Sequence, residues 1–155
     1  MKLFLPFLLT FLVLAFNTKA QKTDEQLRQL ADKIAHKYIL TDGHVDLPYR
    51  LKIKNFRLER QYLGIPISTT EGDFDYERAK KGGLSAPFMS IYIPSSYQQT
   101  GGAKELADSL ITMVKGIATA HPDKFAVVTT PQQADANFKK RIISFPMGME
   151  NGAPI

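Results

Sequence analysis

An imidazole and a carboxylate stand two residues apart at His44 and Asp46, where a short apolar stretch gives way to polar residues. In a strand, residues i and i+2 point to the same side, so these two side chains would project together while Val45 points away. One histidine nitrogen and one carboxylate oxygen could then bind the same divalent cation at about 2 Å. The alternative is that Asp42 and Gly43 form a turn that the two residues merely decorate. The triplet alone does not decide between these interpretations.

The elements that would position these residues alternate between helices and strands. The segment Thr23–Gln26 has the form of a capping box, in which a hydroxyl and an amide satisfy each other's backbone donors. Pro48 should close the first strand, because proline cannot donate a ladder hydrogen bond. Residues 50–80 show no sustained periodicity before about residue 73. The pattern predicts helices over 24–38, 73–81, 103–120 and 131–136, strands over 38–46, 86–94 and 141–149, and a short extended segment at 125–129.

This order of strand, helix, strand, helix and strand is typical of an α/β protein with a parallel sheet. A closed (β/α)8 TIM barrel needs eight such units and about 250 residues, and only about the first three strands are present. At the C-terminal end of a first barrel strand, His44 and Asp46 would face the mouth where barrel enzymes place their active sites. We therefore expect residues 21–155 to be the N-terminal part of a truncated barrel domain, which should not be stable by itself.

The first twenty residues are typical of a signal peptide. Lys2 supplies a positive charge, and the run from Leu3 to Phe16 is apolar over about 14 residues, the length of an h-region. The alternative is a membrane anchor, which needs about 20 apolar residues, and Pro6 and the polar residues 17–19 shorten this run. Such a segment would direct export of the protein to a periplasm or the extracellular space. We expect cleavage near Ala20, which would remove residues 1–20.

Charge and cysteine content narrow the classes of partner and metal site. The formal charge is +5, and it would fall to +3 when cleavage removes the two lysines of the signal segment. The densest basic cluster, at residues 50–60, alternates with apolar side chains and indicates a solvated strand or loop edge, so no nucleic-acid partner is expected. The chain has no cysteine, so any metal must be held by histidine and carboxylate.

Three segments in the same order resemble one known family. The string Asp-Gly-His-Val-Asp-Leu-Pro at residues 42–48 resembles the opening metal motif of the renal (membrane) dipeptidases, the zinc metallopeptidases of peptidase family M19. Residues 78–94 resemble the family's second barrel strand with its Gly-Gly entry. Residues 147–152 are similar to the segment that carries the family's metal-bridging glutamate. The order of the three matches is more specific than any one of them.

The resemblance implies a dipeptidase that hydrolyses the peptide bond of dipeptides with water activated by a two-zinc site. His44 and Asp46 would bind the first Zn²⁺, and Glu150 would bridge two ions about 3.5–4 Å apart. The family's histidines for the second zinc, its substrate-binding residues and its late catalytic aspartate would lie beyond Ile155. No catalytic residue is therefore expected in this chain, and the fragment alone should be inactive. The full-length protein would take dipeptide substrates. Whether it forms a homodimer is left open by the sequence.

Departures from the family pattern leave alternatives. Val45 stands where the family often has asparagine, and Asn151 stands where many members have glycine, which could alter the backbone near the metals. A barrel hydrolase of the amidohydrolase kind usually carries His-x-His on its first strand, and Asp46 argues against it. A non-catalytic secreted binding homologue is a further alternative. His36 is expected to be a surface or packing residue and His121 to end a helix, so neither is assigned to catalysis.

Overall fold

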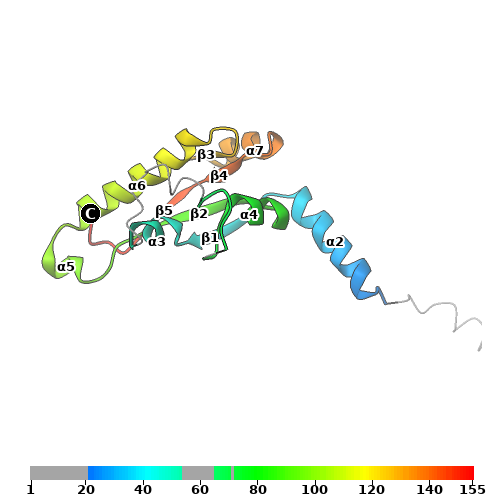
Figure 1. Cartoon of the computed structure of the whole chain (residues 1–155), viewed down its shortest axis with the longest axis horizontal. Coiled ribbons are helices and arrows are strands. Elements are labelled where there is room, and N and C mark those ends of the chain that lie inside the picture. Colours follow the sequence, from blue (N-terminus) through cyan, green and yellow to red (C-terminus); the bar gives the residue numbers. More distant parts are fainter. Residues whose placement is uncertain (1–20, 54–64, 71) are drawn as a thin grey trace, which may run out of the picture. The chain divides into compact units, whose positions relative to one another are not determined.

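The computed structural model describes residues 21–53, 65–70 and 72–155 (Figure 1). The predicted signal peptide at residues 1–20 and most of the basic cluster at residues 50–60 lie outside the described residues. The chain divides into two compact units, Met1–Ala31 and Asp32–Ile155. Within the described ranges, no helix has both the length and the apolar character needed to cross a membrane.

The predicted α/β class with parallel strands is confirmed. The strands are β1 (Leu40–Val45), β2 (Leu84–Tyr92), β3 (Phe125–Val127), β4 (Ile143–Phe145) and β5 (Met147–Glu150). The helices are α2 (Asp24–Lys37), α3 (Leu47–Ile53), α4 (Tyr76–Gly82), α5 (Tyr97–Thr100), α6 (Ala103–Ala120) and α7 (Pro131–Lys139). One parallel sheet has the strand order β1-β2-β5, and β3 pairs with β4 in a second parallel sheet. Helices lie between consecutive strands from β1 to β4, as parallel connections require, whereas only Pro146 separates β4 from β5.

Two local features of the sequence set the bounds of helices: a capping box begins α2, and Gly83 ends α4. The Thr23 N–H donates to Oε1 of Gln26 at 3.0 Å, and the Gln26 N–H donates to Oγ1 of Thr23 at 3.3 Å, which confirms the capping box of α2. Gly83 ends α4 with a left-handed φ of 80°. A Cβ atom at this position would lie 2.6 Å from the carbonyl oxygen of Ala35. The turn between α4 and β2 therefore requires glycine for both its conformation and its space.

The prediction of a single strand over residues 141–149 was wrong. Pro146 divides this segment into β4, which pairs with β3, and β5, which pairs with β2. Proline has no N–H to donate to a ladder, although its carbonyl accepts a hydrogen bond from the Met89 N–H at 2.8 Å. The split matters because only β5 continues toward Glu150 in the three-stranded sheet.

The predicted strand or loop edge that begins at Arg50 was also wrong for its described residues, which belong to α3. Pro48 lies in the first turn of this helix, where its missing N–H has no intrahelical partner to lose. Leu47 and Leu51, four residues apart, fall on one helical face and are buried. Helix α3 therefore turns the chain sharply back onto the core immediately after β1.

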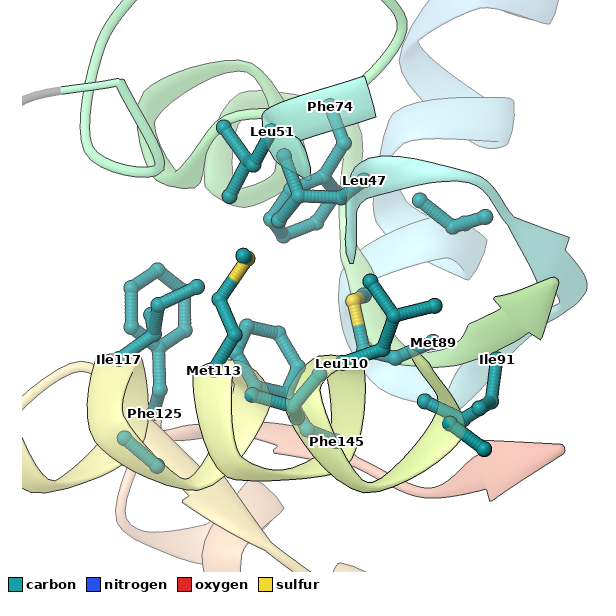
Figure 2. Packing of buried hydrophobic residues seen from close by; sticks show 14 of the residues in the cluster. Leu47, Leu51, Phe74, Met89, Ile91, Leu110, Met113, Ile117, Phe125 and Phe145 are labelled. Carbon is teal, nitrogen blue, oxygen red and sulfur yellow. The ribbon is translucent and has the colours of Figure 1, made fainter. Parts of the chain in front are cut away.

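The core lies between the strands and α6, with α3 on a further side (Figure 2). The rings of Phe125 and Phe145 stack with their centroids 4.6 Å apart, which joins β3 to β4. Leu110 of α6 and Met89 of β2 are fully buried against this cluster. Each such side chain contributes about 1.5–3 kcal/mol through burial. Val45 is also buried in this core, which therefore holds the end of β1 in place.

Candidate metal centre

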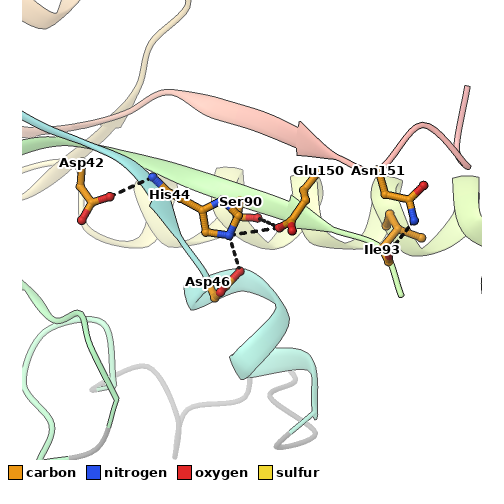
Figure 3. Close-up of polar contacts among 7 residues, drawn as sticks. All are labelled: Asp42, His44, Asp46, Ser90, Ile93, Glu150 and Asn151. Atoms are coloured by element: carbon orange, nitrogen blue, oxygen red, sulfur yellow. Dashed lines mark hydrogen bonds and ion pairs between the residues drawn. The ribbon is translucent and has the colours of Figure 1, made fainter. Parts of the chain in front are cut away.

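Three acidic or imidazole side chains converge at the carboxyl ends of β1 and β5 (Figure 3). The Nε2 atom of His44 lies 3.2 Å from Oδ1 of Asp46 and 3.1 Å from Oε2 of Glu150. One ligand atom from each of the three residues lies within 4.8 Å of the others. Ligands bound tetrahedrally to zinc at 2.0–2.2 Å are about 3.4 Å apart. The spread of these donor atoms therefore fits a single divalent cation.

The end of β1 positions the first two of these residues. Asp42 and Gly43 lie inside β1, so the alternative of a separate turn does not apply. The register with β2 shifts between Asp42 and Val45, and the Asp42 carboxylate accepts a hydrogen bond from the His44 N–H at 2.9 Å. Val45 points into the core while His44 and Asp46 are exposed, as the alternation of a strand predicts. The alternation persists although β1 ends at Val45.

Glu150 reaches the same point through the sheet. Strand β5 pairs in parallel with β2, with Glu150 opposite Tyr92, and β1 pairs with the other edge of β2. Because both pairings are parallel, the two outer strands end at the same, carboxyl end of the sheet. The side chain of Glu150 is 44% exposed, and those of His44 and Asp46 are about half exposed. The three donors are thus open to solvent and to further ligands.

A buried serine that the sequence analysis did not single out holds Glu150. The Ser90 hydroxyl donates to Oε2 of Glu150 at 3.0 Å, and Ser90 is only 3% exposed. Ser90 pairs in register with Gly148, and Glu150 lies two residues further along β5. Residues two apart on a strand share a face, so Ser90 and Glu150 lie on the same face of the sheet. The sequence alone does not reveal this contact, because its prediction requires the register between β2 and β5.

Asn151 follows directly after Glu150 and takes a left-handed backbone with a φ of 80°. Glycine adopts this conformation without strain, and asparagine does so more readily than most residues. The Asn151 side chain donates from Nδ2 to the carbonyl oxygen of Ile93 at 3.0 Å, and its Oδ1 accepts from the Ala153 N–H at 3.0 Å. The asparagine therefore takes the conformation that glycine would permit, and it fastens the end of β5 to the end of β2.

The donor set determines which metals suit the centre. One imidazole nitrogen and two carboxylates suit zinc and other first-row divalent cations, and no thiolate is required. A carboxylate has two oxygens, so Glu150 could also contact a second cation, which an imidazole nitrogen could not do. His36 and His121 do not belong to the cluster. His36 contacts backbone carbonyls of α2 and α4, and the backbone N–H of His121 donates to the Ile117 carbonyl at the end of α6.

Comparisons with known proteins identify relatives of this chain. Residues 28–155 match the family model of the membrane dipeptidases, peptidase family M19. Dipeptidase 3 of Mus musculus is 28% identical over 130 residues, which cover 84% of this chain and 25% of that protein. Dipeptidase 3 of Rattus norvegicus gives the same identity and coverage. The chain therefore spans about a quarter of the length of the curated relatives it matches.

Solved structures share its fold. Dipeptidase AC, a metallopeptidase of family M19, superposes with a TM-score of 0.65 at 22% identity, over 76% of this chain and 38% of that one. A metallopeptidase from Rhodobacter sphaeroides, liganded with a phosphinate mimic of the dipeptide L-Ala-D-Ala, has a TM-score of 0.64 at 21% identity, over 76% of this chain and 39% of that one. The probable dipeptidase PvdM from Pseudomonas aeruginosa has a TM-score of 0.64 at 16% identity, over 85% of this chain and 33% of that one.

Proposed function

This chain belongs to the membrane dipeptidase family, peptidase family M19, and from that premise we propose that the full-length protein hydrolyses the peptide bond of dipeptides at a two-zinc site. The observation that carries the proposal is the convergence of His44, Asp46 and Glu150 at one end of the parallel sheet. The Rhodobacter sphaeroides relative is liganded with a mimic of a dipeptide, which supports dipeptides as the substrate class.

Each of the three residues has a role that its chemistry supports. His44 and Asp46 would hold one zinc ion through Nε2 and a carboxylate oxygen, and Glu150 would hold that ion and a second one through its two carboxylate oxygens. Bound zinc supplies Lewis-acid polarisation and a water whose pKa is lowered to near neutrality. Ser90 and Asn151 would keep Glu150 at its place, because one contacts its carboxylate and the other fixes the backbone after it.

The proposal extends to architecture and location. Residues 21–155 would form the N-terminal part of a (β/α)8 barrel, with β1, β2 and β5 as its first three strands. The parallel order β1-β2-β5 and the likeness to M19 structures support this assignment. Residues 1–20 would be removed as a signal peptide, and the protein would act in a periplasm or outside the cell.

Zinc-dependent hydrolysis by the purified full-length protein tests the proposal. The protein would be stripped with a chelator, and the release of alanine from L-Ala-L-Ala and L-Ala-D-Ala would be measured before and after zinc is restored. We expect activity to disappear with the metal and to return with it. A protein that binds zinc and cleaves no dipeptide would be a binding homologue, and the proposed activity would then be wrong.

A further inference from the structure

A basic pocket opens at the other end of the strands from His44, Asp46 and Glu150. Its volume is about 430 Å³, and Leu84 and Ile143, at the amino-terminal ends of β2 and β4, form part of its wall. Its basic lining residues are His36, Lys80, Lys139 and Arg141. No acidic residue lines it within the described part of the chain. We refer to these four residues and the hollow between them as the basic pocket.

Lys80 brings a partly desolvated ammonium group into the basic pocket. It lies in the last turn of α4, and its Nζ donates to the carbonyl oxygen of Arg141 at 3.0 Å. Burial, together with the nearby positive charge of Arg141, lowers the pKa of Lys80. The described residues offer Lys80 no carboxylate partner within ion-pair distance. The fold thus holds two like charges close together, an arrangement that an anion between them would relieve.

Arg141 stands where the backbone alone would favour glycine. It follows α7 with a left-handed φ of 61°, its N–H donates to the Phe138 carbonyl, and the Ile142 N–H donates to the Asn137 carbonyl. This is the pattern of a helix end at which glycine is most common. A guanidinium at this position offers a planar fork of donors that matches the geometry of an oxyanion.

His36 closes one side of the basic pocket as a donor to two backbone carbonyls. Its Nδ1 lies 2.9 Å from the Asp32 carbonyl oxygen and its Nε2 lies 3.1 Å from the Lys80 carbonyl oxygen. Both acceptors can be satisfied only when both ring nitrogens carry protons. The Asp32 carboxylate lies 3.3 Å from Nδ1, so it would balance the charge of a protonated ring. Lys80, Lys139 and Arg141 therefore supply the charge that the described residues leave uncompensated.

We propose that the basic pocket binds a small oxyanion of the size of phosphate, with Lys80 and Arg141 as its direct donors. The bound anion would neutralise two adjacent cations and would link the end of α4 to the end of α7. Because the pocket lies at the amino-terminal ends of the strands, the anion would act on stability rather than on the chemistry at the carboxyl ends.

Inorganic phosphate is the probe for the test. The purified full-length protein would be titrated with phosphate in calorimetry, and its thermal unfolding would be followed in phosphate and in sodium chloride of matched ionic strength. We expect saturable binding of phosphate and a rise in Tm that chloride does not reproduce. Phosphate binding no different from that of chloride would overturn the proposal.

Substitutions distinguish phosphate binding at the basic pocket from a nonspecific effect of net charge. Lys80→Gln and Arg141→Gly should each weaken phosphate binding by about tenfold or more, as expected for loss of a charged hydrogen bond. Arg141→Gly also removes the left-handed strain, so its Tm without phosphate should not fall, which excludes misfolding as the cause. Lys115 is an exposed residue of α6 that does not line the pocket. Lys115→Gln changes the net charge equally and should bind phosphate as the wild type does. Equal weakening by Lys115→Gln would contradict a site at this pocket.

Discussion

The Nε2 atom of His44 lies 3.1 Å from Oε2 of Glu150, although the two residues come from opposite edge strands of a three-stranded sheet. The same nitrogen lies 3.2 Å from Asp46, so one imidazole nitrogen faces two carboxylates. An imidazole nitrogen and two carboxylates at this spacing can act together as ligands of one divalent cation. Metal binding must therefore compete with protons, because each ligand binds the metal in its deprotonated form.

Replacing Glu150 with glutamine tests its role as a ligand. The neutral amide removes one negative charge and bridges two cations poorly, so bound zinc should fall clearly and dipeptide hydrolysis should be lost. Metal content by elemental analysis and turnover of L-Ala-L-Ala measure the two effects. Glu105→Gln, at an exposed position of α6, should leave both at the wild-type level. Normal zinc and turnover in Glu150→Gln would remove Glu150 from the centre.

Replacing Ser90 with alanine tests whether the hydroxyl positions Glu150. The buried donor at 3.0 Å would be lost, and loss of such an outer hydrogen bond typically lowers metal affinity by about 10–100-fold. The dissociation constant for zinc, measured by competition with a chelator, reports this change. Ser144→Ala is a matched control, because Ser144 is equally buried and contacts Asn137 away from the centre. Similar zinc affinities in the two variants would show that the Ser90 contact has no positioning role.

Local and non-local parts of this centre differ in how far the sequence reveals them. The joint projection of His44 and Asp46 follows from the period of a strand, so two residues suffice to predict it. The approach of Glu150 depends on the sheet order β1-β2-β5, which no local pattern encodes, and only a family resemblance indicated it. The Ser90 contact further requires the register of β2 with β5. The structure brings these residues together, while their binding of zinc stays a prediction.

Segments with two compatible periods explain the errors in secondary structure. In the segment Leu47–Ile53, apolar residues alternate with polar ones over part of its length, yet Leu47 and Leu51 also fit one helical face. Burial of both leucines decides for the helix, and that burial depends on α6, far along the chain. Pro146 was visible in the sequence, but its effect, the transfer of the chain from one sheet to the other, depends on which strands are available as partners.

Substitutions of Asn151 should rank glycine above alanine. Alanine loses both side-chain hydrogen bonds and must hold a left-handed backbone, so Asn151→Ala should lower the free energy of unfolding by about 1–3 kcal/mol. Asn151→Gly loses the same hydrogen bonds but removes the strain. Its free energy of unfolding should therefore exceed that of the alanine variant by about 1 kcal/mol or more. Denaturant unfolding of the purified protein measures the ranking. An alanine variant as stable as the glycine variant would contradict the backbone argument.

His36 should make stability fall as the pH rises above 6.5, the ordinary pKa of histidine. Hydrogen bonds to the Asp32 and Lys80 carbonyls raise the pKa of His36 above its ordinary value of 6.5. The Asp32 carboxylate acts in the same direction, and burial and the Lys80 charge oppose it. The folded state therefore binds this proton more tightly than the unfolded chain does. Its contribution to stability is complete below the unfolded pKa and is lost as the pH rises through the folded one. Denaturant unfolding from pH 6 to 9 should show a steeper loss for the wild type than for His36→Gln, and equal slopes would show that the proton contributes nothing.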